Sequence, residues 1–112
     1  MLVYSVRSEF SDPDTRQRYL DWLTGGHAQA LITQGGALRA EVALLDDGSV
    51  ETRYLFPSRD AFAAYEAGPA IALRADSVAK FPPSPDIRST RSTGTISGIY
   101  PPSPPPNDAP RH

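Results

Sequence analysis

The strongest constraint on the fold is a pair of alternating segments on either side of Asp47-Gly48. Apolar and polar side chains alternate over residues 37–45 and again over residues 50–56, which is typical of strands with one buried face. The Asp-Gly dipeptide favours a tight hairpin turn with positive backbone angles. These residues therefore predict an antiparallel hairpin with one apolar face and one face of balanced charge.

Two further segments are predicted to be strands of the same sheet. Residues 2–10 alternate in the same way and place Tyr4 among the apolar positions. Residues 87–99 are rich in threonine and serine, which favours an extended strand of low hydrophobicity. The chain thus offers four strands, one near each end and two in the middle.

A helical pattern follows the first strand but contains a pair of glycines. The sequence "SDPD" at residues 11–14 is a helix start signal, and apolar residues then recur at three- and four-residue steps. Gly25 and Gly26 interrupt this pattern, and each interior glycine costs about 1 kcal/mol relative to alanine. We therefore expect one helix to end near Thr24 and a second, short helix to span residues 27–34.

A second helical region lies between the hairpin and the last strand. Ser58 is predicted to cap a helix that ends at Gly68, and Pro69 is suited to open another. The apolar spacing predicts the inward positions of this last helix to be Ile71, Ala75, Val78 and Phe81.

The order of the elements predicts an α+β protein with the ferredoxin-like βαββαβ arrangement, an antiparallel four-stranded sheet with helices on one face. The second face would stay open unless another molecule covered it, and dimerisation through it would form a dimeric α+β barrel. Six charged strand residues are expected to form a compensated network at such an interface if they share a side: Arg7, Arg39, Glu41, Glu51, Arg53 and Arg91.

The chain has 112 residues, which fits one domain. Its last twelve residues, "PPSPPPNDAPRH", hold half of its prolines and few apolar side chains. We expect the ferredoxin-like domain to span residues 1–100 and residues 101–112 to be a disordered, proline-rich tail. The alternative is an adaptor in which this tail adopts polyproline II and docks in an aromatic-lined groove of a partner.

Composition excludes several classes of function. The net charge is −2 and the arginines form no basic run, so nucleic acid is not an expected partner. With no cysteine and two histidines, neither a thiolate nucleophile nor a metal site is predicted, and no cofactor is implied. No membrane span and no signal peptide are recognisable, which predicts a cytoplasmic protein that does not bind membranes.

Several segments resemble a family of bacterial proteins of about a hundred residues and unknown function, which is similar to the dimeric α+β barrel proteins. They occur in the same order over residues 2–97: "VYSVRSEF", "YLDWLTGGHAQALITQGG", "YLFPSRDAFAAYEAGPAIALRADSVAKFP" and "STRSTGTI". The best matches are the pattern of Tyr19, Trp22 and His27, and the block from Tyr65 to Phe81. The resemblance implies a homodimer and implies no catalytic residue.

His27 is the best candidate for a catalytic residue, because it is the one imidazole of the predicted domain and titrates near neutral pH. It lies on the apolar stripe between Leu23 and Leu31. If it opens the second helix, the helix dipole disfavours its charged form. The alternatives are a structural, hydrogen-bonded histidine and a ligand-binding or acid-base residue.

Aromatic residues are expected to gather with His27 between the sheet and the helices. They form either an aromatic core or a small apolar pocket with a few hydroxyls. The candidates for the pocket are Tyr4, Tyr19, Trp22, His27, Tyr54 and Tyr65. The main hypothesis is a cytoplasmic dimer that binds a small apolar molecule. The alternative is a cofactor-free monooxygenase or isomerase of the dimeric barrel type that acts on a polycyclic substrate.

Overall fold

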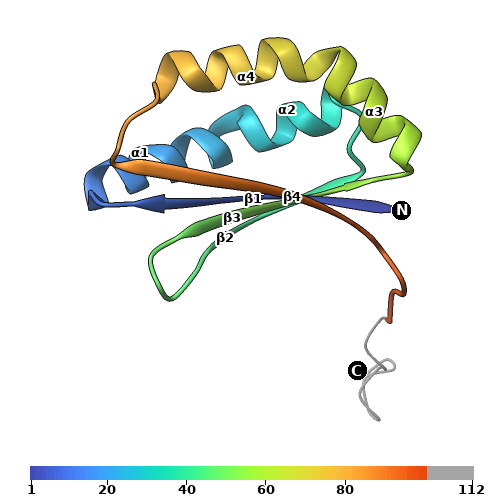
Figure 1. Cartoon of the computed structure of the whole chain (residues 1–112), viewed down its shortest axis with the longest axis horizontal. Coiled ribbons are helices and arrows are strands. Elements are labelled where there is room, and N and C mark those ends of the chain that lie inside the picture. The colour runs from blue at the N-terminus through green and yellow to red at the C-terminus, as the bar shows by residue number, and fades with distance from the viewer. Residues whose placement is uncertain (101–112) are drawn as a thin grey trace, which may run out of the picture.

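The four strands pair in the order β2-β3-β1-β4, and each neighbouring pair is antiparallel. A computed structural model describes residues 1–100. Its strands are β1 (Leu2–Phe10), β2 (Arg39–Leu44), β3 (Val50–Phe56) and β4 (Ile87–Thr95). Its helices are α1 (Pro13–Trp22), η1 (Leu23–His27), α2 (Ala28–Thr33), α3 (Arg59–Ala67) and α4 (Pro69–Lys80), and all of them cover one face of the sheet (Figure 1). The ferredoxin-like arrangement is confirmed, whereas the predicted proline-rich tail lies outside the described residues.

The hairpin between β2 and β3 forms where it was predicted, but with a different turn. A two-residue turn of the expected type needs positive φ at both central positions. Only Gly48 has a positive φ (88°), while the Asp47 carboxylate accepts a hydrogen bond from the backbone N–H of Ser49 at 2.9 Å. The backbone N–H of Leu45 donates to the carbonyl of Ser49 at 2.8 Å. The loop is therefore a three-residue connection that ends in a left-handed glycine.

The helical segment after β1 is kinked at the glycine pair, close to the predicted break near Thr24. Asp12 caps α1 as expected, accepting from the backbone N–H groups of Asp14 and Thr15. At the glycine pair the five residues of η1 join α1 to α2 through one wide turn, in which the N–H of Ala28 bonds the carbonyl of Leu23, five residues back. Gly26 leaves helical backbone angles within this turn, so the glycines form a kink between two helices.

Gly26 has a φ of 152°, which residues with a Cβ rarely adopt. We expect Gly26→Ala to lower the free energy of unfolding by about 1 to 3 kcal/mol because it introduces backbone strain. Gly25 is the matched control: it has helical angles and open space where a Cβ would lie. Gly25→Ala should raise stability by about 0.4 to 1 kcal/mol. Chemical denaturation of both variants checks the opposite signs, and equal effects would contradict the strained turn.

Helix α3 begins at the predicted cap, since the Ser58 hydroxyl accepts from the N–H of Ala61 at 3.0 Å. Of the predicted inward positions of this region, Phe81 packs against Tyr19 and Trp22 as expected, but α4 itself turns a different side to the sheet. Ile71 and Val78 are 68% and 52% exposed, while Ala70 and Leu73 are buried. The inner side of α4 therefore follows Ala70 and Leu73, and the larger aliphatic residues face solvent.

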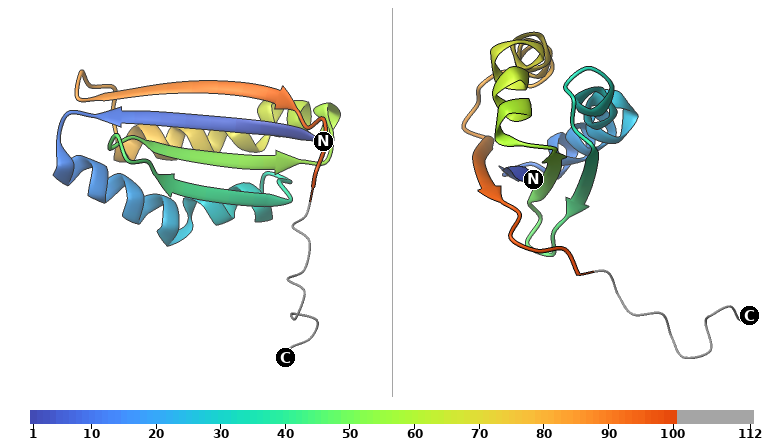
Figure 2. Two further views of the ribbon diagram at one scale, coloured as in Figure 1. Left: turned by 90° about the horizontal axis from the view of Figure 1, so that it is seen from below. Right: turned by 90° about the vertical axis from the view of Figure 1, so that its right-hand side faces the viewer.

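Helices cover one face of the sheet and leave the other face open, as the views in Figure 2 show. Of the six predicted network residues, all but Arg91 lie on the open face, where Arg7 bonds Asp47 at 2.6 Å and Ser5 donates to Glu51 at 3.0 Å. Arg91 is a correction: it lies opposite Val6 on the helix-covered side. The register of β4 against β1, which composition alone does not reveal, decides this placement.

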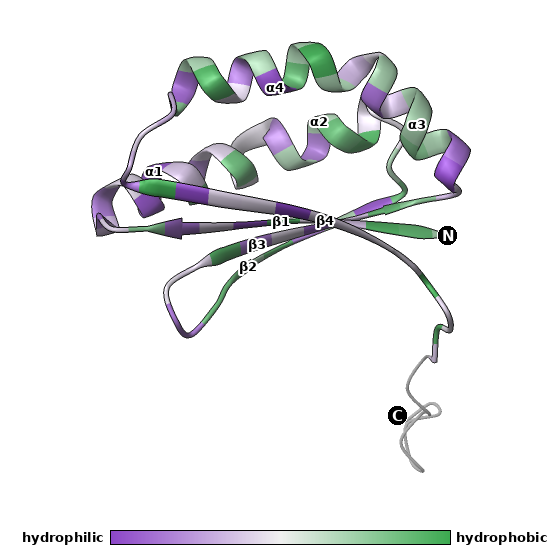
Figure 3. Ribbon diagram, in the orientation of Figure 1, coloured by the Kyte–Doolittle hydropathy of each residue, from purple (hydrophilic) through white to green (hydrophobic). Residues whose placement is uncertain are grey.

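The core between sheet and helices is divided into two clusters. Figure 3 shows that apolar and polar residues alternate along the helices and strands. The larger cluster includes Leu2, Tyr54, Phe56 and Tyr65, and the smaller one is built on Tyr19, Leu23 and Val50. The candidate site lies between them.

Candidate functional site

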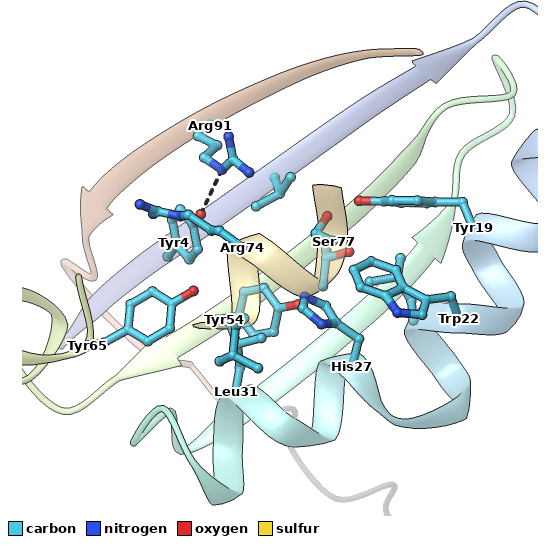
Figure 4. A pocket seen from close by; sticks show the side chains of 14 residues that line it. Tyr4, Tyr19, Trp22, His27, Leu31, Tyr54, Tyr65, Arg74, Ser77 and Arg91 are labelled. Carbon is cyan, nitrogen blue, oxygen red and sulfur yellow. Dashed lines mark hydrogen bonds between the residues drawn. The ribbon is translucent and has the colours of Figure 1, made fainter. Parts of the chain in front are cut away.

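All six predicted pocket residues line one cavity between the two core clusters (Figure 4). They come from five different elements, so the fold, and not sequence proximity, brings them together. They are Tyr4 on β1, Tyr19 and Trp22 on α1, His27 on η1, Tyr54 on β3 and Tyr65 on α3. The aromatic core and the pocket, which were weighed as alternatives, are thus parts of one arrangement.

Four polar residues outside the predicted pocket set also line the cavity: Thr52, Arg74, Ser77 and Arg91, the last of which was predicted as a member of the charged network. Thr52 lies in the apolar alternation of β3, where a lone threonine gives no sign of a site. Arg74 and Ser77 reach the cavity because α4 turns toward the sheet the side that carries Ala70 and Leu73. Among the residues that line the cavity, two are arginines and none is a carboxylate.

His27 stacks on Trp22, with ring centroids 3.9 Å apart and an angle of 20° between the planes. Burial lowers the pKa of His27, and the nearby charge of Asp76 offsets this in part. Its imidazole is therefore neutral at neutral pH and able to accept a proton. His27 stands at the N-cap position of α2, as predicted, and burial is the main cause of its lowered pKa.

Burial keeps three tyrosine hydroxyls of the cavity neutral, those of Tyr19, Tyr54 and Tyr65, by raising their pKa. Burial raises the pKa of Tyr65 to about 12 and raises the pKa of Tyr54 further. The hydroxyl of Tyr19 accepts from Ser8 at 3.3 Å, and that of Tyr4 accepts from Nε of Arg91 at 3.0 Å. Figure 4 shows the hydroxyls of Tyr54 and Tyr65 directed into the space between the arginines and His27.

The cavity is small, about 40 Å³. A buried water needs about 10 to 15 Å³ and benzene fits a cavity of about 150 Å³, so this space holds water but not an aromatic ring. A groove of about 410 Å³ lies on the outer side of η1 and α4. Cavity and groove share three residues, Trp22, His27 and Leu73, which form the wall between them. Moving this wall would join the two spaces.

Within residues 1–100, no group of three or more histidine, aspartate or glutamate side chains is arranged to hold a metal ion. In the same part of the chain, no helix has both the length and the apolar character needed to cross a membrane.

No family model matches the chain, and no curated protein is similar to it in sequence. Solved structures do match its fold. A monooxygenase of Streptomyces coelicolor, solved in complex with the ligand Nanaomycin D, is 24% identical, with a TM-score of 0.69 over 91% of this chain and 92% of that one. SnoaB, a cofactor-independent oxygenase of Streptomyces nogalater, is 16% identical, with a TM-score of 0.62 over 89% and 96%.

A dimeric ferredoxin-like protein from an uncultured marine organism is also similar, with 16% identity and a TM-score of 0.66 over 88% of this chain and 97% of that one. The fold is that of dimeric ferredoxin-like proteins. At these identities the likeness extends to the fold and not to the reaction. The predicted membership of a bacterial family of unknown function stays a prediction.

Proposed function

We propose that this protein is a cofactor-independent oxygenase that acts on a small aromatic molecule. The observation that carries the proposal is the lining of the cavity, where a neutral imidazole, four phenols and two guanidinium groups meet with no carboxylate among them. Two of the structurally similar proteins are a monooxygenase and a cofactor-independent oxygenase, which supports the same class. The predicted binding of a small apolar molecule becomes the first step of this reaction.

The proposed chemistry begins with removal of a proton. His27 accepts a proton from an acidic C–H or O–H group of the substrate, leaving an anion delocalised over the ring. Arg74, Arg91 and the phenol hydroxyls stabilise its charge. The anion reduces O2 directly: a ring CH2 becomes a carbonyl, one oxygen atom enters the product and the other leaves as water. The four electrons lost by the carbon reduce both oxygen atoms, so no external reductant is needed.

Entry of the substrate requires the wall between cavity and groove to move. Trp22 precedes and His27 follows the kink at Gly26, where the backbone already departs from helical angles. Glycine permits such a change of backbone direction at low steric cost. We infer that an aromatic substrate displaces the stacked pair toward the outer groove and takes its place against the tyrosines.

The proposal is tested with dithranol, a dihydroxyanthrone with an acidic CH2 group beside phenolic rings. We expect the protein to consume one O2 per dithranol converted to the quinone, faster than the reaction without protein and without added metal or flavin. Oxygen uptake and absorbance measure this. Binding of dithranol by calorimetry with no oxygen uptake would contradict the oxygenase and leave the predicted non-catalytic binder.

We also infer a homodimer formed through the open sheet face. Val3 and Leu55 on this face, with Ile96 and Ile99 after β4, form the apolar part of a groove of about 210 Å³. Arg39, Glu41 and Arg53 line the same groove, and charges of both signs allow such a surface to face a second copy of itself. The similarity to dimeric ferredoxin-like proteins supports the same arrangement.

Leu55→Glu should shift this dimer toward monomer, because each interface would gain two carboxylates in the apolar part of the groove. Ile71→Glu is the matched control, since Ile71 is 68% exposed on the outer side of α4. Light scattering across a dilution series should show a monomer for the first variant and an unchanged dimer for the second. A wild-type monomer at every concentration would contradict the dimer.

A further inference from the structure

Two buried side-chain polar atoms in residues 1–100 lack a hydrogen-bond partner, and both belong to the cavity. They are Oγ1 of Thr52, on a residue that is 1% exposed, and Nε of Arg74. Buried polar groups in native proteins are nearly always paired, because an unpaired group loses its hydration without compensation. Two such atoms beside one cavity can be paired by the water that the cavity is large enough to hold, or by a polar group of a ligand that displaces this water.

The charges around the cavity indicate what kind of group this is. Glu66 binds Nη2 of Arg74 at 2.6 Å in a half-exposed ion pair that orients the guanidinium and offsets part of its charge, while Nε makes no hydrogen bond. The Tyr4 hydroxyl lies beside the same guanidinium. Arg91 donates through Nε to the hydroxyl of Tyr4 and has no carboxylate partner within residues 1–100. Figure 4 shows both guanidinium groups on the same side of the cavity, beside the Tyr4 hydroxyl. Guanidinium donors in such a position bind negatively charged oxygen.

From this arrangement we propose that the cavity is selective for aromatic molecules that carry an oxyanion, a carboxylate or an ionised ring hydroxyl. Arg74 and Arg91 bind the charged oxygen, and the Thr52 hydroxyl bonds a second polar atom of the ligand. The aromatic ring lies against the tyrosines and Trp22. This inference rests on the proposed aromatic ligand and not on its oxidation.

Two pairs of probes of matched size test the selectivity. The first pair is lawsone, a hydroxynaphthoquinone that is ionised at neutral pH, and its methyl ether, which has no acidic proton. The second pair is naphthoate and naphthamide. Calorimetry with the full chain at neutral pH should show tighter binding of the anion in at least one pair, and the pair that discriminates identifies the type of oxyanion. Equal affinity within both pairs, or no binding of any probe, overturns the proposal.

Variants then assign the preference to the two arginines. Arg74→Met and Arg91→Met should each weaken binding of the preferred anion by about 10- to 100-fold, the effect of a hydrogen bond to a charged group, and leave its neutral counterpart nearly unchanged. Arg88→Met removes the same charge from the opposite side of β4 and is the matched control. An equal loss in Arg88→Met would mean that net charge alone attracts the anion, and it would overturn the subsite.

Thr52→Val separates a ligand contact from a purely structural position. The change removes the unpaired hydroxyl at nearly constant shape, so we expect unchanged or higher thermal stability. Affinity for the preferred anion should fall about two- to tenfold. Unchanged affinity would remove Thr52 from the subsite. If the protein selects anions but does not oxidise dithranol, this inference stands and the oxygenase is contradicted. If it oxidises dithranol but does not select anions, only this inference is contradicted.

Discussion

Replacing His27 by glutamine is expected to lower kcat/KM for dithranol oxidation by about 100- to 10,000-fold, the usual contribution of a positioned general base. Glutamine approximates the size and polarity of the imidazole but cannot take up a proton near neutral pH. Oxygen uptake measures the rate, and calorimetry measures whether dithranol still binds. Retained binding with a lost rate supports the acid-base role. A normal rate, or a loss of stability with intact turnover, would leave His27 as a structural residue.

The pH dependence gives an independent test of His27. Because burial lowers its pKa, the base is already neutral below its usual value of 6.5. The rate should therefore fall only at a pH below 6.5 in the wild-type protein. Stability should follow the same direction: the unfolded chain takes up a proton first, so the free energy of unfolding decreases as the pH falls from 6.5 through the lower folded pKa. This part of the pH dependence should be absent from His27→Gln.

Phe56→Ala should cause the largest loss of stability, about 3 to 5 kcal/mol. Phe56 is fully buried, and its ring lies 5.2 Å from that of Phe62 and 5.3 Å from that of Tyr65. Truncation leaves a cavity beside the tyrosine that forms one wall of the site. Urea denaturation measures the loss, which is large compared with the total stability of a small domain.

The control for Phe56→Ala is Val78→Ala on α4, where the side chain is 52% exposed. This change should alter stability by less than about 0.5 kcal/mol. Similar losses in the two variants would contradict the division between the buried sheet face and the exposed side of α4.

The topology could be predicted because its signals are local and repeated. Alternation with a period of two identifies strands, and the caps at Asp12 and Ser58 mark where α1 and α3 begin. Once the order of strands and helices is known, few arrangements can bury every apolar face. The same topology explains why Tyr4 and Tyr54 were predicted to meet, since they are opposite each other on β1 and β3.

The interruption at Gly25-Gly26 could be predicted, because two adjacent glycines weaken a helix, and Gly26 adopts a φ of 152° that interrupts it. The inner side of the second helix could not be predicted in the same way. Leu23 and Ala28 are both buried and are five residues apart, whereas the predicted stripe continued from Leu23 to His27.

The polar part of the site depends on packing that sequence periodicity does not record. Arg74 lines the cavity because α4 presents Ala70 and Leu73 inward, and small or short residues there let the helix approach the sheet. The hydrophobic pattern favoured Ile71 and Val78 at those positions. The size of the cavity also depends on how closely the rings of the two core clusters pack, and this is a property of the whole fold.

Trp22 is the one tryptophan of the chain, and it stacks on His27 in the wall between cavity and groove. Its fluorescence therefore reports on this wall alone, without a background from other indoles. Displacement of the imidazole by a ligand, or its protonation in acid, changes the immediate surroundings of the emitting ring. The wild-type protein thus contains its own optical probe for the rate at which the wall opens, which stopped-flow measurements can follow without any label.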